Sequence, residues 1–352
     1  MARRSLDIKR GYSWGVLYYD TLSHRFSYRE KKSRSSEPYP NQPVVLNIVI
    51  TRACNMDCDY CVAKDFAGIQ DEDLALSSEM IRWINRSPFM LLVLTGGEPL
   101  MPPYDAISLR LINSVKDRGI ILDTNGTFIP DHKVLSRLKK RRVMVRVSMD
   151  SMRVDEEIEL RHMAKGGSLD DRSTYRKKLT NVERFLSAGL TTTIQTVVWR
   201  NNPDGLYQMI DWLSEHGIKQ WYLQRLIPSY KFRYPPVRFS LKQHDYYSLV
   251  ADVAAKAHSA GIECIPKMDL RHNSVFLLTA DGVVYTQGAE PGQKVRLGTI
   301  KDKMEYFDYV SAADHACRYY LAHVPQDEKN WSSDRVVTLD AKAKTSESGG
   351  IK

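Results

Sequence analysis

Three cysteines within eight residues are the part of this sequence whose type and spacing are best suited to chemistry. Cys54, Cys58 and Cys61 follow directly after an apolar run. At this spacing three thiolates can ligate three irons of a [4Fe–4S] cluster, which leaves the fourth iron open to a small molecule. The alternative is a structural zinc site. Zinc favours a fourth Cys or His ligand at fixed spacing, and the next histidine is the distant His132.

A second candidate motif, Gly96-Gly97-Glu98-Pro99, ends the next apolar run. Two glycines remove side chains, so that the backbone can approach a ligand closely, and the proline stiffens the exit of the loop. Asn125 and Ser148 stand at the ends of the two apolar runs that follow. An ordinary tight turn is the alternative for the glycine motif, and ordinary turn residues are the alternative for Asn125, Ser148 and Asp150.

The elements that must position these residues alternate regularly. The pattern predicts strands at 44–51, 90–95, 119–124, 143–148, 191–199 and 218–227. It predicts helices from Ser77 and over 104–116, 131–139, 175–188 and 204–216, with a polar insertion at 150–173. Regular alternation of strand and helix is typical of an α/β fold with a parallel sheet and helices outside it. The candidate residues all follow strands, at the edge of the sheet where such folds place functional loops.

The flanking segments divide the chain into four predicted parts. Residues 1–43 are expected to form a hairpin and a linker, and residues 44–228 the alternating domain. Residues 229–325 are expected to form a small α+β domain, with a helix over 241–260 and a hairpin around Asp281-Gly282. The polar segment 326–352 is predicted to be a mobile tail.

The composition is that of an ordinary globular protein, with 43% hydrophobic and 26% charged residues. The net charge of +9 is spread widely, and two short basic runs, 31–34 and 139–142, are interpreted as solvated faces. Attraction to a phosphorylated or acidic partner or to a nucleic acid is the alternative, but no RNA-binding signature supports a nucleic acid. No apolar run reaches transmembrane length and no secretory signal is evident, so we expect a cytoplasmic protein without membrane contact.

The use of cysteine also favours reduced thiolates and metal over disulfides. Five cysteines are present, and three of them lie in the eight-residue cluster. The remaining two, Cys264 and Cys317, are expected to be small buried hydrophobic residues.

At Cys54, Cys58 and Cys61 the sequence resembles the radical S-adenosylmethionine (SAM) superfamily, whose hallmark is Cys-x3-Cys-x2-Cys. Tyr60 is the aromatic residue that commonly precedes the third cysteine, and Gly96-Gly97-Glu98-Pro99 matches a second motif of the family. The resemblance covers roughly residues 44–228. It implies a partial (β/α)6 TIM-like barrel in which one electron from a reduced [4Fe–4S] cluster cleaves SAM. Methionine and a 5′-deoxyadenosyl radical result, and the radical takes a hydrogen atom from the substrate.

The resemblance also implies roles for individual residues. The amino and carboxylate groups of SAM would chelate the open iron, and Glu98 would accept a hydrogen bond from the ammonium. Tyr60 would pack against the adenine, while Asn125 and Ser148 would meet the ribose or the carboxylate. The electron would come from a donor such as flavodoxin or ferredoxin.

The last third of the chain resembles the SPASM or twitch extension of peptide-modifying members, but without its cysteines. Thr286-Gln287 stands where a cysteine is expected after the hairpin. We therefore predict a single cluster and a cluster-free, twitch-like domain. A peptide is the favoured substrate, and a nucleoside or sugar in a biosynthetic pathway is the alternative. A non-catalytic iron–sulfur or zinc protein is the alternative of a different class.

Overall fold

The computed structural model describes residues 7–11, 15–30, 45–61, 76–164, 170–226, 239–267, 276–287 and 294–302. The predicted linker from residue 31 to residue 43, Cys317 and the predicted tail at 326–352 lie outside these residues.

The six predicted strands form neighbouring parallel strands of one sheet, which confirms the α/β prediction. They are β4 (Val45–Thr51), β5 (Leu91–Gly96), β6 (Gly119–Thr124), β7 (Met144–Ser148), β8 (Thr191–Val198) and β9 (Gln220–Arg225). Short, nearly continuous apolar runs suit such strands because both faces of a parallel sheet are covered.

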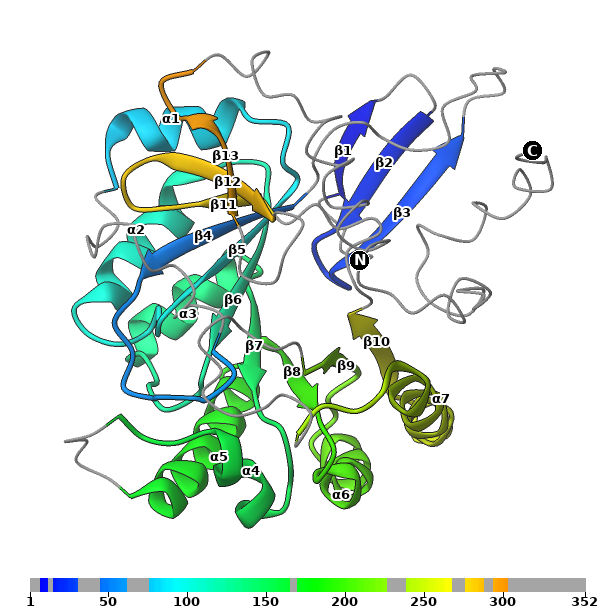
Figure 1. The fold of residues 1–352 in the computed structure, drawn as a ribbon. Coiled ribbons are helices and arrows are strands. Elements are labelled where there is room, and N and C mark those ends of the chain that lie inside the picture. Colours follow the sequence, from blue (N-terminus) through cyan, green and yellow to red (C-terminus); the bar gives the residue numbers. More distant parts are fainter. Residues whose placement is uncertain are drawn as a thin grey trace.

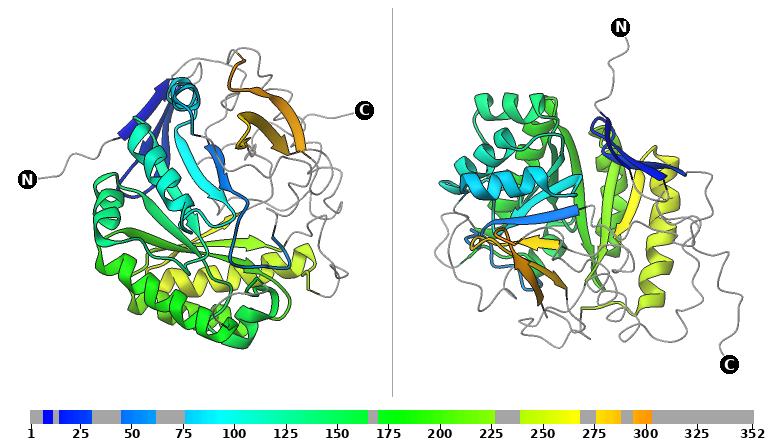
Figure 2. Two further views of the ribbon diagram at one scale, coloured as in Figure 1. Left: turned by 90° about the vertical axis from the view of Figure 1, so that its left-hand side faces the viewer. Right: turned by 90° about the horizontal axis from the view of Figure 1, so that it is seen from above.

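Helices cover the outside of the curved sheet (Figure 2). They are α1 (Ser78–Arg86), α2 (Tyr104–Ser114), α3 (His132–Lys140), α5 (Asp171–Ser187), α6 (Pro203–Glu215) and α7 (Gln243–Ser259). The side chains of Ser77, Asp131 and Asp170 accept hydrogen bonds from backbone N–H groups of the first turns and fix where three of these helices begin. The main hydrophobic core lies between these helices and the sheet.

Two elements after β7 were not expected from the sequence pattern. The predicted polar insertion contains α4 (Val154–Leu160), and α5 begins at Asp171 instead of residue 175, because Asp170 caps it. Beyond α7, β10 (Glu263–Lys267) pairs in parallel with β9 and extends the sheet. Its short, mixed sequence carries little strand signal, so the pairing partner decides its structure.

The C-terminal hairpin joins the opposite edge of the same sheet. β11 (Phe276–Leu278) lies parallel to β4, and β12 (Val283–Gln287) and β13 (Lys294–Thr299) follow in antiparallel pairing. Gly282 adopts a positive φ of 77° at the predicted turn. The sheet therefore has ten strands in the order β10-β9-β8-β7-β6-β5-β4-β11-β12-β13 (Figure 1).

A separate antiparallel sheet lies at the amino ends of the parallel strands. It contains β1 (Asp7–Gly11) and the predicted hairpin, β2 (Gly15–Asp20) and β3 (Arg25–Glu30). A Cβ atom on Gly119, at the start of β6, would lie 2.1 Å from the ring of Tyr19. The amide of Gln220, at the start of β9, donates to the carbonyl of Ser23 at 3.0 Å. This sheet therefore closes the amino end, and a site must be sought at the carboxyl end.

No helix of the described residues is long and apolar enough to cross a membrane.

Candidate active site

The cysteine loop follows β4 and is held against the loop after β5. The amide of Gly97 donates to the carbonyl of Thr51 at 2.6 Å, and the amide of Glu98 donates to the carbonyl of Ala53 at 2.9 Å. A Cβ atom on Gly97 would lie 1.9 Å from the carbonyl oxygen of Ala53, and one on Gly96 would lie 2.3 Å from that of Thr51. The atoms that exclude a side chain at both glycines belong to the end of β4 and to the start of the cysteine loop.

A second segment, residues 160–164 after α4, holds the other side of the cysteine loop. The amides of Asp57 and Asp59 donate to the carbonyls of His162 and Leu160 at 2.8 and 2.9 Å. The amide of Ala164 returns a hydrogen bond to the carbonyl of Asn55 at 2.9 Å. The loop is thus fixed by backbone contacts to two distant segments, a placement that local sequence does not reveal.

The three cysteines are free thiols, each partly exposed, and two of them have strongly shifted pKa values. Burial, with help from the Glu98 carboxylate and Cys61, raises the pKa of Cys54 to about 11. Burial raises the pKa of Cys58 to about 12; Cys61 and Cys54 add to this effect and Arg161 opposes it. The thiols therefore lie close enough to repel one another as thiolates.

Three neighbouring thiolates need a positive charge beside them to offset their repulsion. The cationic core of an iron–sulfur cluster would supply that charge. Among the described residues, no three His, Cys, Asp or Glu side chains converge on the position of one metal ion.

Glu98 is completely buried and joins the glycine motif to the end of β6. Its carboxylate accepts hydrogen bonds from the hydroxyl of Thr124 at 2.8 Å and from the amides of Asn125 and Leu100 at 2.6 and 2.9 Å. Burial nevertheless raises its pKa to about 7, although these three donors lower it. A cationic group near this carboxylate would stabilise its charged form.

Asn125 contacts the cysteine loop directly. Its side-chain amide donates to Asn55 Oδ1 at 2.8 Å and lies 3.6 Å from Cys54 Sγ. Its own Oδ1 accepts from the amide and the hydroxyl of Thr127 at 2.9 and 2.6 Å. The structure therefore brings together the loops after β4 and β6, the two strands on either side of β5.

Tyr60 reaches the end of β7 through its hydroxyl. The phenol donates to the carboxylate of Asp150 and accepts a hydrogen bond of 2.8 Å from Arg161 Nη1. Its ring packs against a small apolar cluster that includes Trp199 and Phe239.

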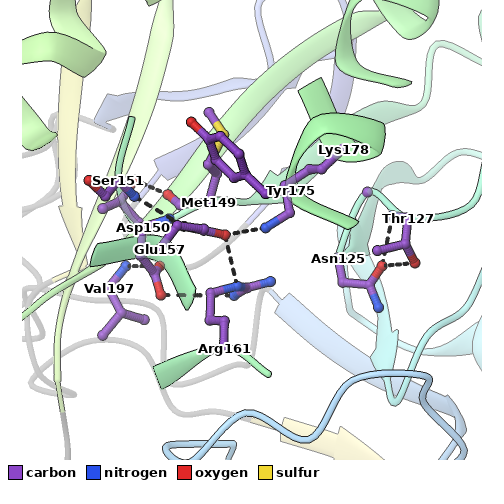
Figure 3. A network of polar contacts seen from close by, with 12 residues as sticks. Asn125, Thr127, Met149, Asp150, Ser151, Glu157, Arg161, Tyr175, Lys178 and Val197 are labelled. Atoms are coloured by element: carbon purple, nitrogen blue, oxygen red, sulfur yellow. Dashed lines mark hydrogen bonds and ion pairs between the residues drawn. The ribbon is translucent and has the colours of Figure 1, made fainter. Parts of the chain in front are cut away.

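Asp150 and Arg161 belong to a buried network of four charged side chains (Figure 3). Glu157 forms an ion pair with Lys178, and its carboxylate lies 3.2 Å from Arg161 Nε. Arg161 Nη1 lies 4.0 Å from the Asp150 carboxylate. Glu157 also accepts hydrogen bonds from the amides of Asp150 and Ser151 at 2.6 and 3.1 Å. Burial raises the pKa of Asp150 to about 6, with Glu157 adding to the effect and Arg161 opposing it.

Sequence reasoning missed Glu157, Arg161 and Lys178 as parts of the site. They come from α4, the segment after it and α5, and their polar stretches look like solvent-exposed surface. The one available signal was Asp150, two residues after a predicted strand end.

The remaining predicted residues lie nearby or elsewhere. Ser148 is half-buried at the carboxyl end of β7, in register with Gln195 on β8. The carbonyl of Pro99 accepts a hydrogen bond from Ser108 at 2.9 Å. Cys264 lies on β10 and packs against the main hydrophobic core, but it is only partly buried, whereas a buried residue was expected.

Comparison with known proteins agrees with this geometry. Residues 48–213 match the radical SAM superfamily. GTP 3′,8-cyclase of Clostridium perfringens strain 13 is 29% identical over 189 residues, which are 52% of this chain and 55% of that protein. GTP 3′,8-cyclase of Bradyrhizobium diazoefficiens is 28% identical over 196 residues, 53% of each chain. The match thus spans about half the length of these relatives.

Solved structures share more of the fold. Streptococcus suis SuiB bound to S-adenosylmethionine superposes with a TM-score of 0.64 at 12% identity, covering 85% of each chain. The enzyme anSMEcpe with bound AdoMet and the Cp18Cys peptide gives 0.63 at 18% identity, covering 84% of this chain and 88% of that one. The expected partial barrel and its C-terminal antiparallel strands are therefore confirmed. Residues 48–213, which carry the three-cysteine loop and the glycine motif, thus belong to the radical SAM superfamily of enzymes.

Proposed function

We propose that this chain cleaves SAM at a single [4Fe–4S] cluster held by Cys54, Cys58 and Cys61, and that the resulting 5′-deoxyadenosyl radical removes a hydrogen atom from a peptide. When bound, the cluster supplies the electron that breaks the carbon–sulfur bond of SAM. A one-electron donor such as flavodoxin or ferredoxin reduces it.

Several side chains support a SAM site beside the cysteine loop. Glu98 offers a buried carboxylate with a raised pKa, suited to an ammonium group. Arg161 offers a buried guanidinium suited to a carboxylate. Asn125 and Ser148, at the ends of β6 and β7, are the candidates for polar contacts to the ribose or carboxylate. Tyr60 contributes its ring to the wall of the same site.

The observation that carries the peptide proposal is the continuation of the barrel sheet into β11, β12 and β13. The similarity to anSMEcpe and to SuiB covers 84% and 95% of the chain in their peptide-bound structures. The similarity to GTP 3′,8-cyclase covers 52% of the chain. A nucleotide substrate is the second candidate, because the sequence identity to those relatives is higher.

The experiment uses anaerobically reconstituted full-length chain with SAM and dithionite. Release of 5′-deoxyadenosine is expected, and a Cys54→Ala, Cys58→Ala, Cys61→Ala variant serves as the control without release. Absence of release from the reconstituted chain under any reductant would favour a binding protein. Product analysis after addition of peptides or of GTP then separates the two substrate classes.

A further inference from the structure

The inner face of the parallel sheet carries a polar side chain from every strand of the barrel. Side chains that point outward, such as Ile48, Leu92 and Leu122, are completely buried beneath the helices. Several inward positions hold half-buried polar residues: Asn47, Thr95, Asp123, Ser148, Gln195, Tyr222 and Gln224. Other inward positions, Leu91, Val93, Ile121 and Met144, form an apolar cluster. A closed barrel normally fills this space with branched apolar residues. The inner face is therefore suited to a polar molecule.

Two of the inward side chains form a bidentate ion pair. Arg146 on β7 donates from Nε and Nη2 to the two carboxylate oxygens of Asp123 on β6, at 2.7 and 2.9 Å. Tyr222 on β9 covers the guanidinium with its ring centroid at 5.0 Å. The side chain of Asp123 remains 21% exposed and that of Arg146 remains 6% exposed. Among the described residues, Arg146 Nη1 has no hydrogen-bond acceptor. A donor on Arg146 and acceptor sites on the Asp123 carboxylate therefore remain next to each other for a ligand.

The pair lies directly below the candidate SAM site. Asp123 precedes Asn125 by two residues, and Asn125 touches Cys54. Arg146 precedes Ser148 by the same interval. Two residues along a strand correspond to about 7 Å, roughly the depth of one small substrate group. Tyr19, from the sheet that closes the amino end, lies in the apolar cluster further below. A substrate that lies between the cysteine loop and the Asp123–Arg146 pair would contact both of them.

Stability does not explain the pair. A buried ion pair loses hydration on both partners, and apolar residues of similar volume are often at least as stabilising. A bidentate pair fixed across two strands does, however, present a rigid polar edge to a ligand.

We propose that Asp123 and Arg146 form the floor of the substrate site and bind a neutral carboxamide of the substrate. Its carbonyl accepts from Arg146 Nη1 and its N–H donates to Asp123. This rests on the proposed peptide substrate, whose main chain and Asn or Gln side chains carry such groups. The pair has no net charge, so a charged group would be buried there without compensation.

The test compares two perdeuterated, isosteric probes, N-acetylasparaginamide and N-acetylaspartic acid α-amide, on the reconstituted full-length chain. Hydrogen abstraction breaks a carbon–deuterium bond of the probe and forms one at the 5′ carbon, so deuterium in 5′-deoxyadenosine reports binding. The wild type should transfer deuterium from the amide at concentrations at least about tenfold lower than from the acid.

The variant Asp123→Asn leaves the Arg146 charge unpaired and should reverse this preference. The double variant Asp123→Leu, Arg146→Met should transfer from neither probe, yet melt no lower than the wild type. The control Arg25→Met, Glu263→Leu removes an exposed ion pair at the amino end and should behave as the wild type.

An unchanged preference in Asp123→Asn, or no transfer from either probe to the wild type, would overturn the inference. Deuterium transfer from ribose-deuterated GTP, with none from the amide or the acid probe, would also overturn it. That result would assign the floor to a nucleotide. In each case release of 5′-deoxyadenosine continues. Loss of that release from the wild type would instead overturn the proposed function.

Discussion

The hydroxyl of Tyr60 donates a hydrogen bond to the carboxylate of Asp150, ninety residues further along the chain. This contact joins the residue before the third cysteine to the end of β7, and Arg161 completes it with a hydrogen bond of 2.8 Å to the same hydroxyl. The position of the cysteine loop therefore depends on a side chain as well as on its backbone contacts.

We predict that Tyr60→Phe folds but holds its cluster more weakly. The ring packing stays, while the buried hydrogen bonds of the hydroxyl are lost, at a cost of about 1–3 kcal/mol. Iron loss to a chelator, followed by absorbance, should be about tenfold faster than in the wild type. Tyr207→Phe is the matched control, because the Tyr207 hydroxyl bonds the exposed Asp252 at 2.6 Å. Equal rates in the two variants would contradict an anchoring role.

Gly97→Ala should disturb the site more than its surroundings. The added Cβ would lie 1.9 Å from the carbonyl oxygen of Ala53, and backbone must move to relieve this contact. We expect reduced iron content per chain and a lower melting temperature. Gly217→Ala is the control, since nothing lies within 4 Å of its added Cβ, although its φ of 67° costs about 1 kcal/mol. Full iron content in Gly97→Ala would show that the loop adapts.

The prediction of a single cluster can be tested by counting the irons bound per chain. Anaerobic reconstitution should give about four irons per chain, and the triple Cys→Ala variant at 54, 58 and 61 should give none. Iron and sulfide analysis of the purified chain measures this. About eight irons would contradict the prediction and point to a second cluster.

Because His24 is buried, the folded protein should lose stability in mild acid. Burial lowers its pKa from 6.5 to about 4, against the opposing effect of Asp20. The unfolded chain binds a proton at higher pH than the folded chain, so this contribution is complete above pH 6.5 and lost as the pH falls towards 4. Between pH 7 and 4.5 the wild type should lose about 2.5 kcal/mol more unfolding free energy than His24→Asn. Asparagine tolerates the positive φ of 54° at this position. Parallel pH curves for the two proteins in chemical denaturation would rule out this role.

Sequence patterns were sufficient for the elements whose signals are local. The strand at 119–124 was predicted to the residue, and a helix was predicted to begin near Ser77, which is the N-cap of α1. Apolar runs, capping side chains and the Asp-Gly turn each act over a few residues, so a single sequence contains them. α4 and β10 were missed because neighbouring segments, and not their own composition, stabilise them.

The sequence by itself predicted Cys54, Cys58 and Cys61 as candidate ligands, and it contained the glycine motif and the pattern of the parallel sheet that brings strand ends together. Only the tertiary structure showed what these glycines contact, that Tyr60 is held by Asp150 and Arg161, and that Asp123 pairs with Arg146. These contacts join segments from different strands and helices. Their geometry depends on strand register and on which face each side chain occupies, and a one-residue shift in register would reverse that face.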